Sequence, residues 1–370
     1  MRIVEIITGL NCGGAENLLL DLCREQKATG AEILVIYLKK EEYLLPDFKK
    51  SGIDVIHIDK DKLGVVSTIF SIRKEVKKFK PDIVSTHLVM ADSLGRLACM
   101  FIKNIKVVST VHNTDVWMTE KALPYAMLRM FNRITINCFK RNHLIAVSEC
   151  ARQFVMHYEK IKPHKITALL NFISRDKKKS SKPVTREEIG LTEDDFVILN
   201  VGRLTLQKSQ IDILQSAKKL RDKGLGKLKF IILGEGELRG ELEQYIKENS
   251  LTDIVSLPGV VSNVYNYMQI SDLFLLTSDY EGFGLVIVEA FYNKLPVLST
   301  RIPVTDEVVA GGKYGVLFNP HKIDDIVSEI EKIVNDEYNL NIVKEEAYKF
   351  ALSLSPENYV KERYEIFDNI

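Results

Sequence analysis

The feature that most constrains the fold of this chain is an alternation of short apolar runs with amphipathic segments. The runs are rich in Val, Ile and Leu and are apolar throughout, rather than at every second residue. Strands buried on both faces show this pattern, and helices between such strands indicate a parallel sheet covered on both sides. The predicted strands are residues 2–8, 31–38, 54–58, 82–88, 106–112, 143–148, 196–204, 229–237, 254–260, 273–278 and 295–300.

A polar, basic segment with one proline, residues 174–188, interrupts the alternation and is typical of a linker. The alternation then restarts, and the chain ends with predicted helices at about 322–335 and 340–370. A length of 370 residues also exceeds one ordinary core. We therefore expect two open α/β domains in tandem, with a cleft between them. In such folds ligands bind at the carboxyl ends of the strands.

Composition excludes several classes of function. With 51 Lys and Arg against 50 Asp and Glu, the chain lacks the basic excess of a nucleic-acid binder. Its five cysteines are odd in number and form no CxxC pair, which fits thiols in a reducing cytosol better than disulfides or a zinc site. The amino terminus does not resemble a signal peptide, and no apolar run approaches a membrane span. We expect a cytoplasmic protein.

Two glutamates, Glu281 and Glu289, flank the start of a predicted helix in "EGFGLVIVEA". Glu289 shares a helix face with Leu285 inside an apolar run, where an unpaired buried carboxylate would cost several kcal/mol. It either accepts hydrogen bonds from a vicinal diol such as ribose, or pairs with a core Arg or Lys. The turn at Gly282 and Gly284 leaves helix N–H groups free, and Glu281 beside it can bind sugar hydroxyls.

Two cations, Arg203 and Lys208, follow a predicted strand that ends at Gly202. Arg offers a planar fork and Lys a point charge, and together they suit a diphosphate. The alternative is that both are solvated loop cations. A further glycine turn, in "LGEGELRGELE" at 233–243, enters a helix and is by itself compatible with a plain turn.

The first predicted strand leads through Gly13 and Gly14 into a helix, which is either an approach for a ligand or a tight turn. The GxGxxG spacing of a dinucleotide site is absent, so NAD is disfavoured. His87 and His112 end two predicted strands. Either can hydrogen-bond a substrate or act as an acid or base near neutral pH; we interpret His87 as structural and favour a functional role for His112.

Taken in order, these motifs resemble the retaining glycosyltransferases of glycosyltransferase family 4, which have the GT-B fold. The likeness rests first on the E-x7-E pair and covers essentially the whole chain. Its other motifs are GGAE (13–16), VHN (111–113), AVSE (146–149), NVGRL…QK (200–208), LGEGELR (233–239), PVLST (296–300) and GVLFNP (315–320).

The resemblance implies two Rossmann-like domains around a cleft. The first, residues 1–173, would bind the acceptor. The second, residues 189–356, would bind a nucleotide sugar. The stretch 174–188 would link them, and a C-terminal helix, residues 357–370, would cross back to the first domain.

The resemblance also implies residue roles. Arg203 and Lys208 would hold the donor diphosphate, Glu281 the hydroxyls of the transferred sugar and Glu289 the donor ribose. His112 would lie near the 6-position of that sugar. The other predicted donor-site residues match loops around the diphosphate, the sugar and the nucleobase: Gly13, Gly14, Gly202, Glu235, Gly236, Gly282, Phe283, Gly284 and Leu285.

The predicted function is transfer of a hexose-type sugar from a nucleotide sugar, UDP-linked in this family, to a saccharide or lipid-linked saccharide with retention of configuration. The expected context is synthesis of surface polysaccharide or lipopolysaccharide. No Asp pair with a DxD-like context ends a strand, so no metal or other cofactor is expected. Two alternatives stay open: a nucleotide-sugar 2-epimerase of the same architecture and a non-catalytic nucleotide-sugar-binding subunit.

One further segment, residues 118–143, mixes apolar with basic side chains and follows Trp117. It is either an amphipathic basic face that contacts anionic lipid at the inner side of a membrane, or an ordinary helix with a solvated basic side. If it contacts lipid, the acceptor is expected to be lipid-linked.

Overall fold

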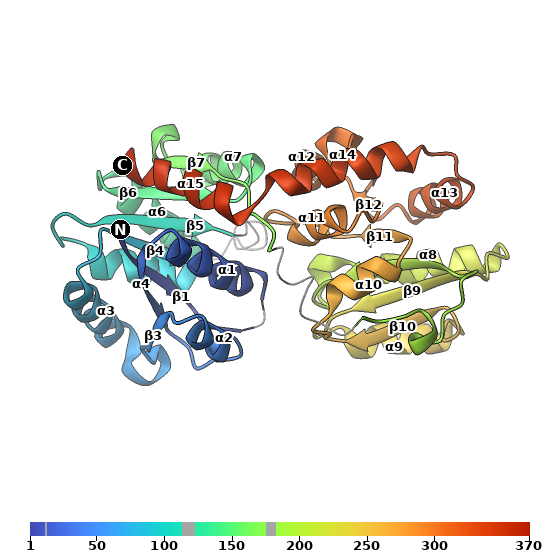
Figure 1. Ribbon diagram of the computed structural model, residues 1–370, viewed down its shortest axis with the longest axis horizontal. Coiled ribbons are helices and arrows are strands. Elements are labelled where there is room, and N and C mark those ends of the chain that lie inside the picture. The colour runs from blue at the N-terminus through green and yellow to red at the C-terminus, as the bar shows by residue number, and fades with distance from the viewer. Residues whose placement is uncertain (12, 113–122, 175–182) are drawn as a thin grey trace. The chain divides into compact units, whose positions relative to one another are not determined.

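The structure is a computed structural model that describes residues 1–370 apart from 12, 113–122 and 175–182 (Figure 1). The chain divides into two compact units. The first consists of Met1–Ser174 together with Leu354–Ile370, and the second is Arg175–Ser353. Most of the predicted linker, as well as Asn113, Trp117 and the beginning of the basic segment 118–143, lies outside the described residues.

The first unit is built on a parallel sheet of seven strands in the order β3-β2-β1-β4-β5-β6-β7. The order reverses direction between β1 and β4, so loops after these two strands diverge and leave room for a ligand. The central strands are almost fully buried, as their unbroken apolar runs predict. The strands are β1 (Arg2–Ile7), β2 (Glu32–Tyr37), β3 (Asp54–His57), β4 (Ile83–His87), β5 (Lys106–Val111), β6 (Asn142–Ala146) and β7 (Ile166–Ala168).

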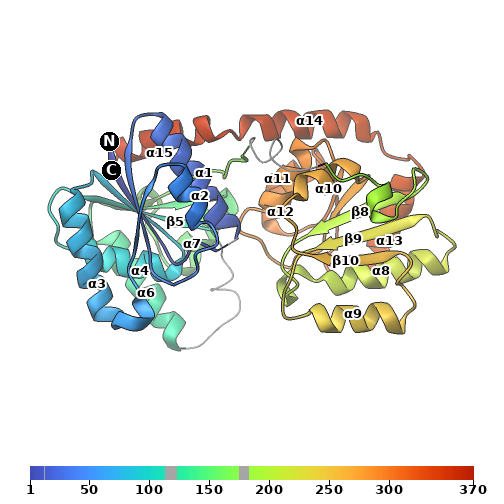
Figure 2. The same ribbon diagram turned by 60° about the horizontal axis from the view of Figure 1, so that its bottom comes forward.

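Helices cover both faces of this sheet (Figure 2). One face carries α1 (Gly14–Ala28), α2 (Leu45–Lys50) and α15 (Pro356–Asp368), and α1 packs against α15. The other face carries α3 (Lys60–Phe79), α4 (Val89–Cys99) and α6 (Leu123–Asn137). Helix α7 (Glu149–Tyr158) packs on β6 and β7.

The second unit repeats the plan with a parallel sheet of six strands, in the order β10-β9-β8-β11-β12-β13. Figure 2 shows α8, α9 and α13 on one face and α10, α11, α12 and α14 on the other. The strands are β8 (Phe196–Val201), β9 (Leu228–Leu233), β10 (Val255–Gly259), β11 (Leu273–Leu276), β12 (Val297–Thr300) and β13 (Val316–Phe318). The helices are α8 (Gln210–Asp222), α9 (Arg239–Glu248), α10 (Val264–Ile270), α11 (Leu285–Tyr292), α12 (Pro303–Val308), α13 (Ile323–Val334) and α14 (Leu340–Ser353).

The end of the chain differs from the single helix predicted at 340–370, because α14 ends at Ser353 and α15 begins at Pro356. Proline lacks the N–H that a continuing helix needs, while the Ser355 hydroxyl accepts from the Asn358 N–H and caps the new helix. The break separates the last helix of the second unit from the C-terminal helix, which returns to the first unit as predicted.

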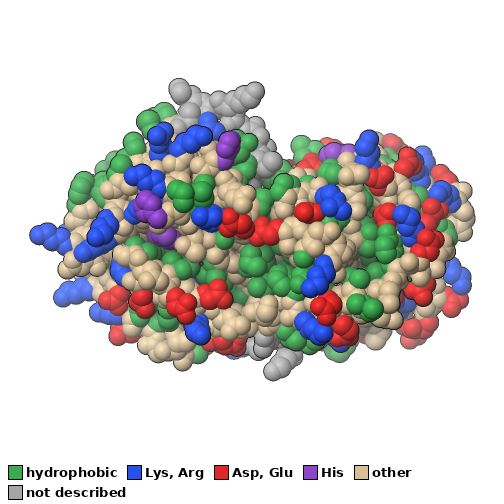
Figure 3. Space-filling model, turned by 90° about the horizontal axis from the view of Figure 1, so that it is seen from above, with side chains coloured by type: hydrophobic (Ala, Val, Ile, Leu, Met, Phe, Trp, Pro, Cys, Tyr) green, Lys and Arg blue, Asp and Glu red, His purple; other side chains and the backbone are tan. Residues whose placement is uncertain are grey.

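Side-chain charge is patterned on the surface although the net charge is only +1. On the face shown in Figure 3, Lys and Arg side chains gather with histidines toward the left end, over the first unit. Acidic and basic side chains are interspersed over the second unit. Among the residues that the structure describes, no helix combines the length and the apolar character that crossing a bilayer requires.

Candidate functional site

Three loops at one edge of the second sheet carry most of the predicted site residues. They follow β8, β9 and β11, which are neighbours in the sheet order, and each loop leads into a helix. Because the strands are parallel, all three loops leave from the same, carboxyl, edge. The fold therefore brings to one sheet edge residues that are up to 87 positions apart in the sequence, from Gly202 to Glu289.

The loops after β8 and β9 contact each other so closely that glycine is needed at two positions. A Cβ atom on Gly234 would lie 1.9 Å from the Gly202 carbonyl oxygen, and one on Gly236 would lie 2.2 Å from the Leu204 carbonyl oxygen. Backbone hydrogen bonds join the same segments, including Leu204 N to Glu235 O at 2.9 Å. The predicted glycines Gly202 and Gly236 thus shape the site through packing of backbone on backbone.

The loops after β8 and β11 are joined by an ion pair between two predicted residues. Lys208 Nζ lies 2.5 Å from Glu281 Oε1, and the two side chains are only 14% and 9% exposed. The Gln207 side chain donates to the Tyr280 carbonyl at 2.8 Å, and the Thr277 hydroxyl donates to the Lys208 carbonyl at 2.8 Å. Removing two charges from water costs free energy, and this cost is offset only where the geometry of the pair is good and further hydrogen bonds surround it. Both conditions are met at Lys208 and Glu281.

The predicted cation Arg203 stands apart from this pair. Its side chain is exposed, and no ion pair within the described part of the chain involves it. By contrast, the predicted Glu235 is held by Arg239 at 2.5 Å on the first turn of α9. Arg203 is therefore a planar donor available to a ligand, whereas Glu235 already has a partner.

Helix α11 begins at Leu285, directly after the glycine turn. Gly284 adopts a left-handed backbone with φ +74°, a conformation that favours glycine, while Gly282 and Phe283 are buried. The first N–H groups of the helix thus open at the same sheet edge as Lys208 and Glu281, and they favour negative charge.

Glu289 lies one turn into α11 and is half-buried, so the expectation that it is enclosed in an apolar run is wrong. Its neighbours Ile287, Val288 and Ala290 point to the core. Glu289 falls on the other side of the helix, with the half-buried Leu285. Its carboxylate therefore lies at the boundary of the core rather than within it.

The structure also contains a cluster that the sequence analysis missed. His321, which follows β13, places Nδ1 3.0 Å from Asp212 Oδ2 and Nε2 3.1 Å from Asp279 Oδ1. The Ser209 hydroxyl donates to the same Asp279 oxygen at 2.9 Å. These contacts brace the segments that contain Lys208 and Glu281. Asp279 precedes the E-x7-E motif by two residues, but nothing in the sequence linked it to His321.

The remaining predicted residues belong to the first unit. Gly13 caps α1, and Gly14 begins it with open space around the position that a Cβ atom would take. His112 directly follows β5 and places Nε2 3.0 Å from His87 Nδ1. Burial, with the nearby positive charge of Arg363, lowers the pKa of His112 to about 3. His112 is therefore neutral at physiological pH and unsuited to act as an acid there.

His87 is buried and bonded to the Glu5 carboxylate at 2.8 Å, which agrees with its interpretation as structural. Glu5 in turn pairs with Arg363 of α15 at 2.9 Å. In the sequence, Glu5 is a single charge inside the predicted strand at 2–8. This charge could have indicated a buried partner, because a fully buried carboxylate needs a cation or hydrogen-bond donors.

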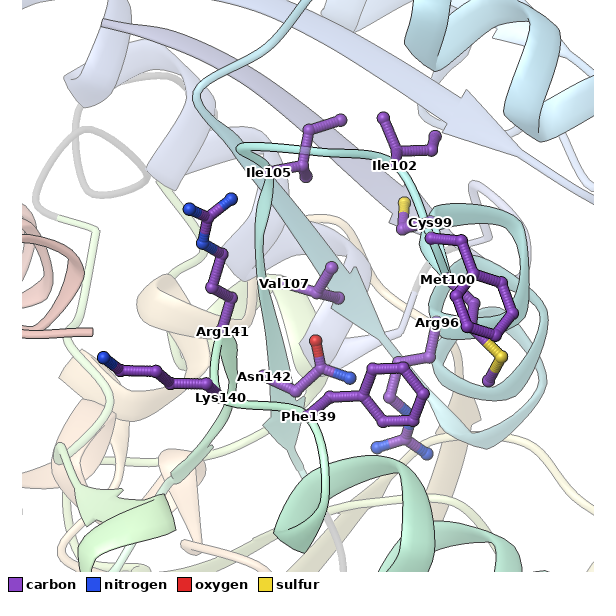
Figure 4. Close-up of a pocket in the computed structure, with 11 residues that line it drawn as sticks. Arg96, Cys99, Met100, Ile102, Ile105, Val107, Phe139, Lys140, Arg141 and Asn142 are labelled. Carbon is purple, nitrogen blue, oxygen red and sulfur yellow. The ribbon is translucent and has the colours of Figure 1, made fainter.

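A cavity of about 280 Å³ opens elsewhere, beside the first residues of β5 and β6 (Figure 4). It lies at the amino-terminal edge of that sheet, opposite to the edge that carries His112. Figure 4 shows an apolar wall with extended Lys140 and Arg141 side chains. None of the predicted site residues lines this cavity. Within the described ranges, no group of three or more His, Cys, Asp or Glu side chains is arranged to hold a metal ion.

Two family models match the chain. The model described as glycosyl transferases group 1 matches residues 181–350, and the model described as glycosyltransferase family 4 matches residues 12–177. Each match corresponds to most of one structural unit.

Known proteins are similar over most of the chain. The UDP-Gal:alpha-D-GlcNAc-diphosphoundecaprenol alpha-1,3-galactosyltransferase of Escherichia coli is 28% identical over 283 residues, 75% of this chain and 72% of that protein. The capsular polysaccharide biosynthesis glycosyltransferase CapM of Staphylococcus aureus is 25% identical over 305 residues, 79% of this chain and 78% of the relative.

Among solved structures, that of HepE from Anabaena in complex with UDP and glucose has a TM-score of 0.87 to this chain. The sequences are 19% identical, and the match covers 100% of both chains. At this identity the likeness shows the fold alone, and it confirms the predicted pair of parallel-sheet α/β domains of the GT-B type.

Proposed function

Because the chain belongs to the group 1 glycosyl transferases, with a family 4 first domain, we propose that it transfers a sugar from a nucleotide sugar to a saccharide or lipid-linked acceptor with retention of configuration. The observation that carries the proposal is the ion pair of Lys208 and Glu281, with Arg203 nearby in sequence and free to bind a ligand. All three lie on loops at the carboxyl edge of the second sheet.

Each group at this edge suits one part of a nucleotide sugar. Arg203 and Lys208, with the N-terminus of α11, suit the diphosphate. Glu281 can accept hydrogen bonds from hydroxyls of the sugar, and Glu289 from the diol of the ribose. UDP is the proposed nucleotide, because the E. coli relative is named for a UDP-linked donor and the HepE structure contains UDP.

In the proposed reaction the bond between the anomeric carbon and the diphosphate oxygen breaks, and the diphosphate leaves with the bonding electrons. An acceptor hydroxyl attacks the same face of the sugar, and its proton passes to an oxygen of the leaving diphosphate. Lys208 and Arg203 stabilise the negative charge that develops on this leaving group. Two protein cations and a helix N-terminus can supply this stabilisation, and we propose that transfer does not depend on a metal.

A surface stripe on α6 favours an acceptor held at a membrane. Met127, Met130 and Ile134 lie on one side of the helix and are 60%, 58% and 49% exposed. Cys138 and Arg133, both exposed, border the stripe. We propose that this stripe contacts anionic lipid, so that a lipid-linked saccharide for surface polysaccharide or lipopolysaccharide is presented to the enzyme. The names of the two bacterial relatives are compatible with such a pathway.

The donor site is tested first by thermal unfolding with UDP-, GDP-, ADP- and CMP-sugars and NAD. A ligand at one hundred times its Kd should stabilise the protein by about 2.7 kcal/mol. We expect stabilisation by UDP-sugars that is lost in Glu289→Ala and kept in Glu243→Ala, an exposed glutamate of α9. Lack of stabilisation by every nucleotide sugar would contradict the donor-site assignment.

The reaction class is tested by product analysis with the stabilising donor. Transfer with retention gives a glycoside whose anomeric configuration, read from its NMR coupling, equals that of the donor. A donor converted to its 2-epimer without any acceptor would show an epimerase instead. Binding without any turnover, in the presence of a broad set of saccharide acceptors, would favour a non-catalytic subunit. Unchanged turnover in EDTA would support transfer without a metal.

Membrane contact is tested by co-sedimentation with vesicles of phosphatidylglycerol and of phosphatidylcholine. We expect binding to the anionic vesicles and a roughly tenfold loss of binding in Ile134→Glu, since a buried aliphatic side chain contributes about that much. Ile342→Glu is the matched control, because Ile342 of α14 is also an exposed isoleucine, at 63% against 49% for Ile134. Equal binding of both variants would argue against the α6 stripe.

A further inference from the structure

A chain of buried polar side chains connects His112 to the C-terminal helix of the first unit. Arg363 of α15 and Glu5 of β1 are fully buried, and His87 at the end of β4 is 3% exposed. Arg363 Nη1 lies 2.9 Å from Glu5 Oε1, His87 Nε2 lies 2.8 Å from Glu5 Oε2, and His87 Nδ1 lies 3.0 Å from His112 Nε2. We call these four residues the buried relay.

The charge at the start of the relay is fixed. Burial alone would raise the pKa of Glu5, but the charge of Arg363 and the hydrogen bond from His87 hold it well below its ordinary value. An ionised carboxylate accepts hydrogen bonds and donates none. The nitrogen that faces Oε2 must therefore supply the hydrogen, so His87 carries a proton on Nε2.

The other nitrogen of His87 then determines what His112 does. Arg363 and Glu5 already cancel each other. Asp92, another buried carboxyl near His87, is opposed by the charge of Arg96. A second buried cation on His87 would thus have no counter-charge of its own. His87 is thus neutral, and its Nδ1 holds a lone pair. At 3.0 Å a lone pair needs a donor opposite, so the hydrogen between the two rings belongs to Nε2 of His112.

One nitrogen of His112 remains. The ring is neutral, because burial and the nearby charges lower its pKa to about 3. With the hydrogen on Nε2, the lone pair of Nδ1 is a hydrogen-bond acceptor. No hydrogen bond among the described residues uses this atom, which lies at the carboxyl edge of the first sheet.

We propose that Arg363, Glu5 and His87 are positioning residues that fix His112 in its Nε2–H form, so that Nδ1 accepts a hydrogen bond from a substrate hydroxyl. The inference rests on the proposed function, which supplies a sugar rich in hydroxyl groups. It assigns His112 to orienting a hydroxyl, and it removes the alternative in which His112 donates a proton.

The direct test is the protonation pattern of the histidine rings. Two-bond ¹H–¹⁵N NMR spectra of the full chain, labelled with ¹⁵N-histidine and without ligand, distinguish the two ring forms at pH 7. We expect both His87 and His112 to carry a hydrogen on Nε2 alone. A hydrogen on Nδ1 of His112, or on both nitrogens of His87, would overturn the proposal whatever the enzyme transfers.

Glu5→Gln is the variant that should invert the relay. Arg363 donates to Oε1 at 2.9 Å and to Oε2 at the longer distance of 3.3 Å, so the amide oxygen takes the Oε1 position and the amide nitrogen turns toward His87. That nitrogen donates, so His87 must accept at Nε2 and carry its hydrogen on Nδ1. Nε2 of His112 then accepts, and its hydrogen moves to Nδ1. Unchanged ring signals of His112 in folded Glu5→Gln would contradict the relay.

Two controls separate this effect from general disturbance of the fold. Ser85→Ala removes a hydroxyl that contacts Arg363 and His87 but leaves the bonds of the relay intact, so the ring signals of His112 should not change. His143 is a buried histidine bonded to Thr167 outside the relay, and its signals should be constant in every variant. If Glu5→Gln does not fold, His87→Phe replaces it, and His112 should then populate both ring forms.

Measurements of turnover distinguish a positioning role of the relay in the reaction from a purely structural role. His112→Ala and His87→Phe should each lower kcat/KM roughly tenfold, the effect of one hydrogen bond of about 1.4 kcal/mol. The double variant should lose no more, because both act through the same bond. Additive losses would overturn the positioning role. If no nucleotide sugar supports turnover, the proposed function fails while the NMR result still decides the ring forms.

Discussion

Lys208 is the residue whose loss should affect the reaction most directly. In the ion pair with Glu281 its ammonium is held in a largely desolvated position, where it can stabilise charge without reorganisation. We predict that Lys208→Ala lowers kcat about 100-fold or more. Lys219→Ala, which breaks an ion pair with Asp324 on the surface, should change it less than twofold. Steady-state kinetics with the identified donor measures both, and equal effects would refute the assignment.

A second residue predicts how stability changes with pH. Burial raises the pKa of Glu159 from 4.5 to about 7, against the opposing charge of Arg96. The folded chain thus holds this proton more tightly than the unfolded chain does. The contribution of Glu159 to the free energy of unfolding is complete below pH 4.5 and is lost as pH rises to about 7.

Glu159→Gln should therefore raise the melting temperature at pH 8 relative to the parent chain and leave it almost unchanged at pH 4.5. Thermal unfolding across this pH range measures the difference. Glu193→Gln, an exposed glutamate, should show no such trend. A melting temperature that falls at pH 8 in Glu159→Gln would mean that the ionised carboxylate stabilises the fold through Arg96.

The sequence predicted single residues better than it predicted their partners. Lys208 and Glu281 were both expected at the site, but their ion pair spans 73 positions and no local spacing implies it. Glu289 was misjudged because a run of apolar letters does not show which side of a short helix faces the core. The buried pair of Glu5 and Arg363 spans 358 positions, and only the lone charge in an apolar strand hinted at it.

Among the elements, the loop after β9 makes the sharpest prediction. Gly236→Ala places a Cβ against the carbonyl oxygen of Leu204, and that backbone cannot move without shifting the segment that contains Arg203. We predict destabilisation of about 1–3 kcal/mol and a reduced thermal shift with nucleotide sugar. The matched control is Gly240→Ala in α9, where no atom lies within 4 Å, and which should stabilise by about 0.5–1 kcal/mol. Similar behaviour of both variants would contradict this packing.

Most long elements could be predicted, because a buried parallel strand is an uninterrupted apolar run and its helices are amphipathic. The short ones could not. Strands β7 and β13 have three residues each, and α2 and α12 have six, too few for a period to be recognised. The end of α14 was missed although Ser355 and Pro356 are a capping pair, since a periodic pattern resumes directly after them.

At the scale of the whole molecule, two units with separate cores should respond separately. Arg363→Met leaves the buried carboxylate of Glu5 without its cation, at a cost of about 3–5 kcal/mol to the first unit. Differential scanning calorimetry should then show one transition moved down and the other, assigned to the second unit by its response to nucleotide sugar, unchanged. Glu5→Leu combined with Arg363→Met should recover part of the loss. A single transition that shifts as a whole would show that the units unfold together.

The return of α15 to the first unit has a consequence for how the protein is made. About 190 residues separate Ser174, where the first part of that unit ends, from Arg363, which neutralises Glu5. At ribosomal rates this segment takes roughly 10 to 40 s to synthesise. Throughout that interval the second unit is being synthesised, and the nascent first unit contains a carboxylate in its central strand whose cation has not yet been made. The part of the chain synthesised first is thus the last to be completed, and we expect it to be the client of chaperones during translation.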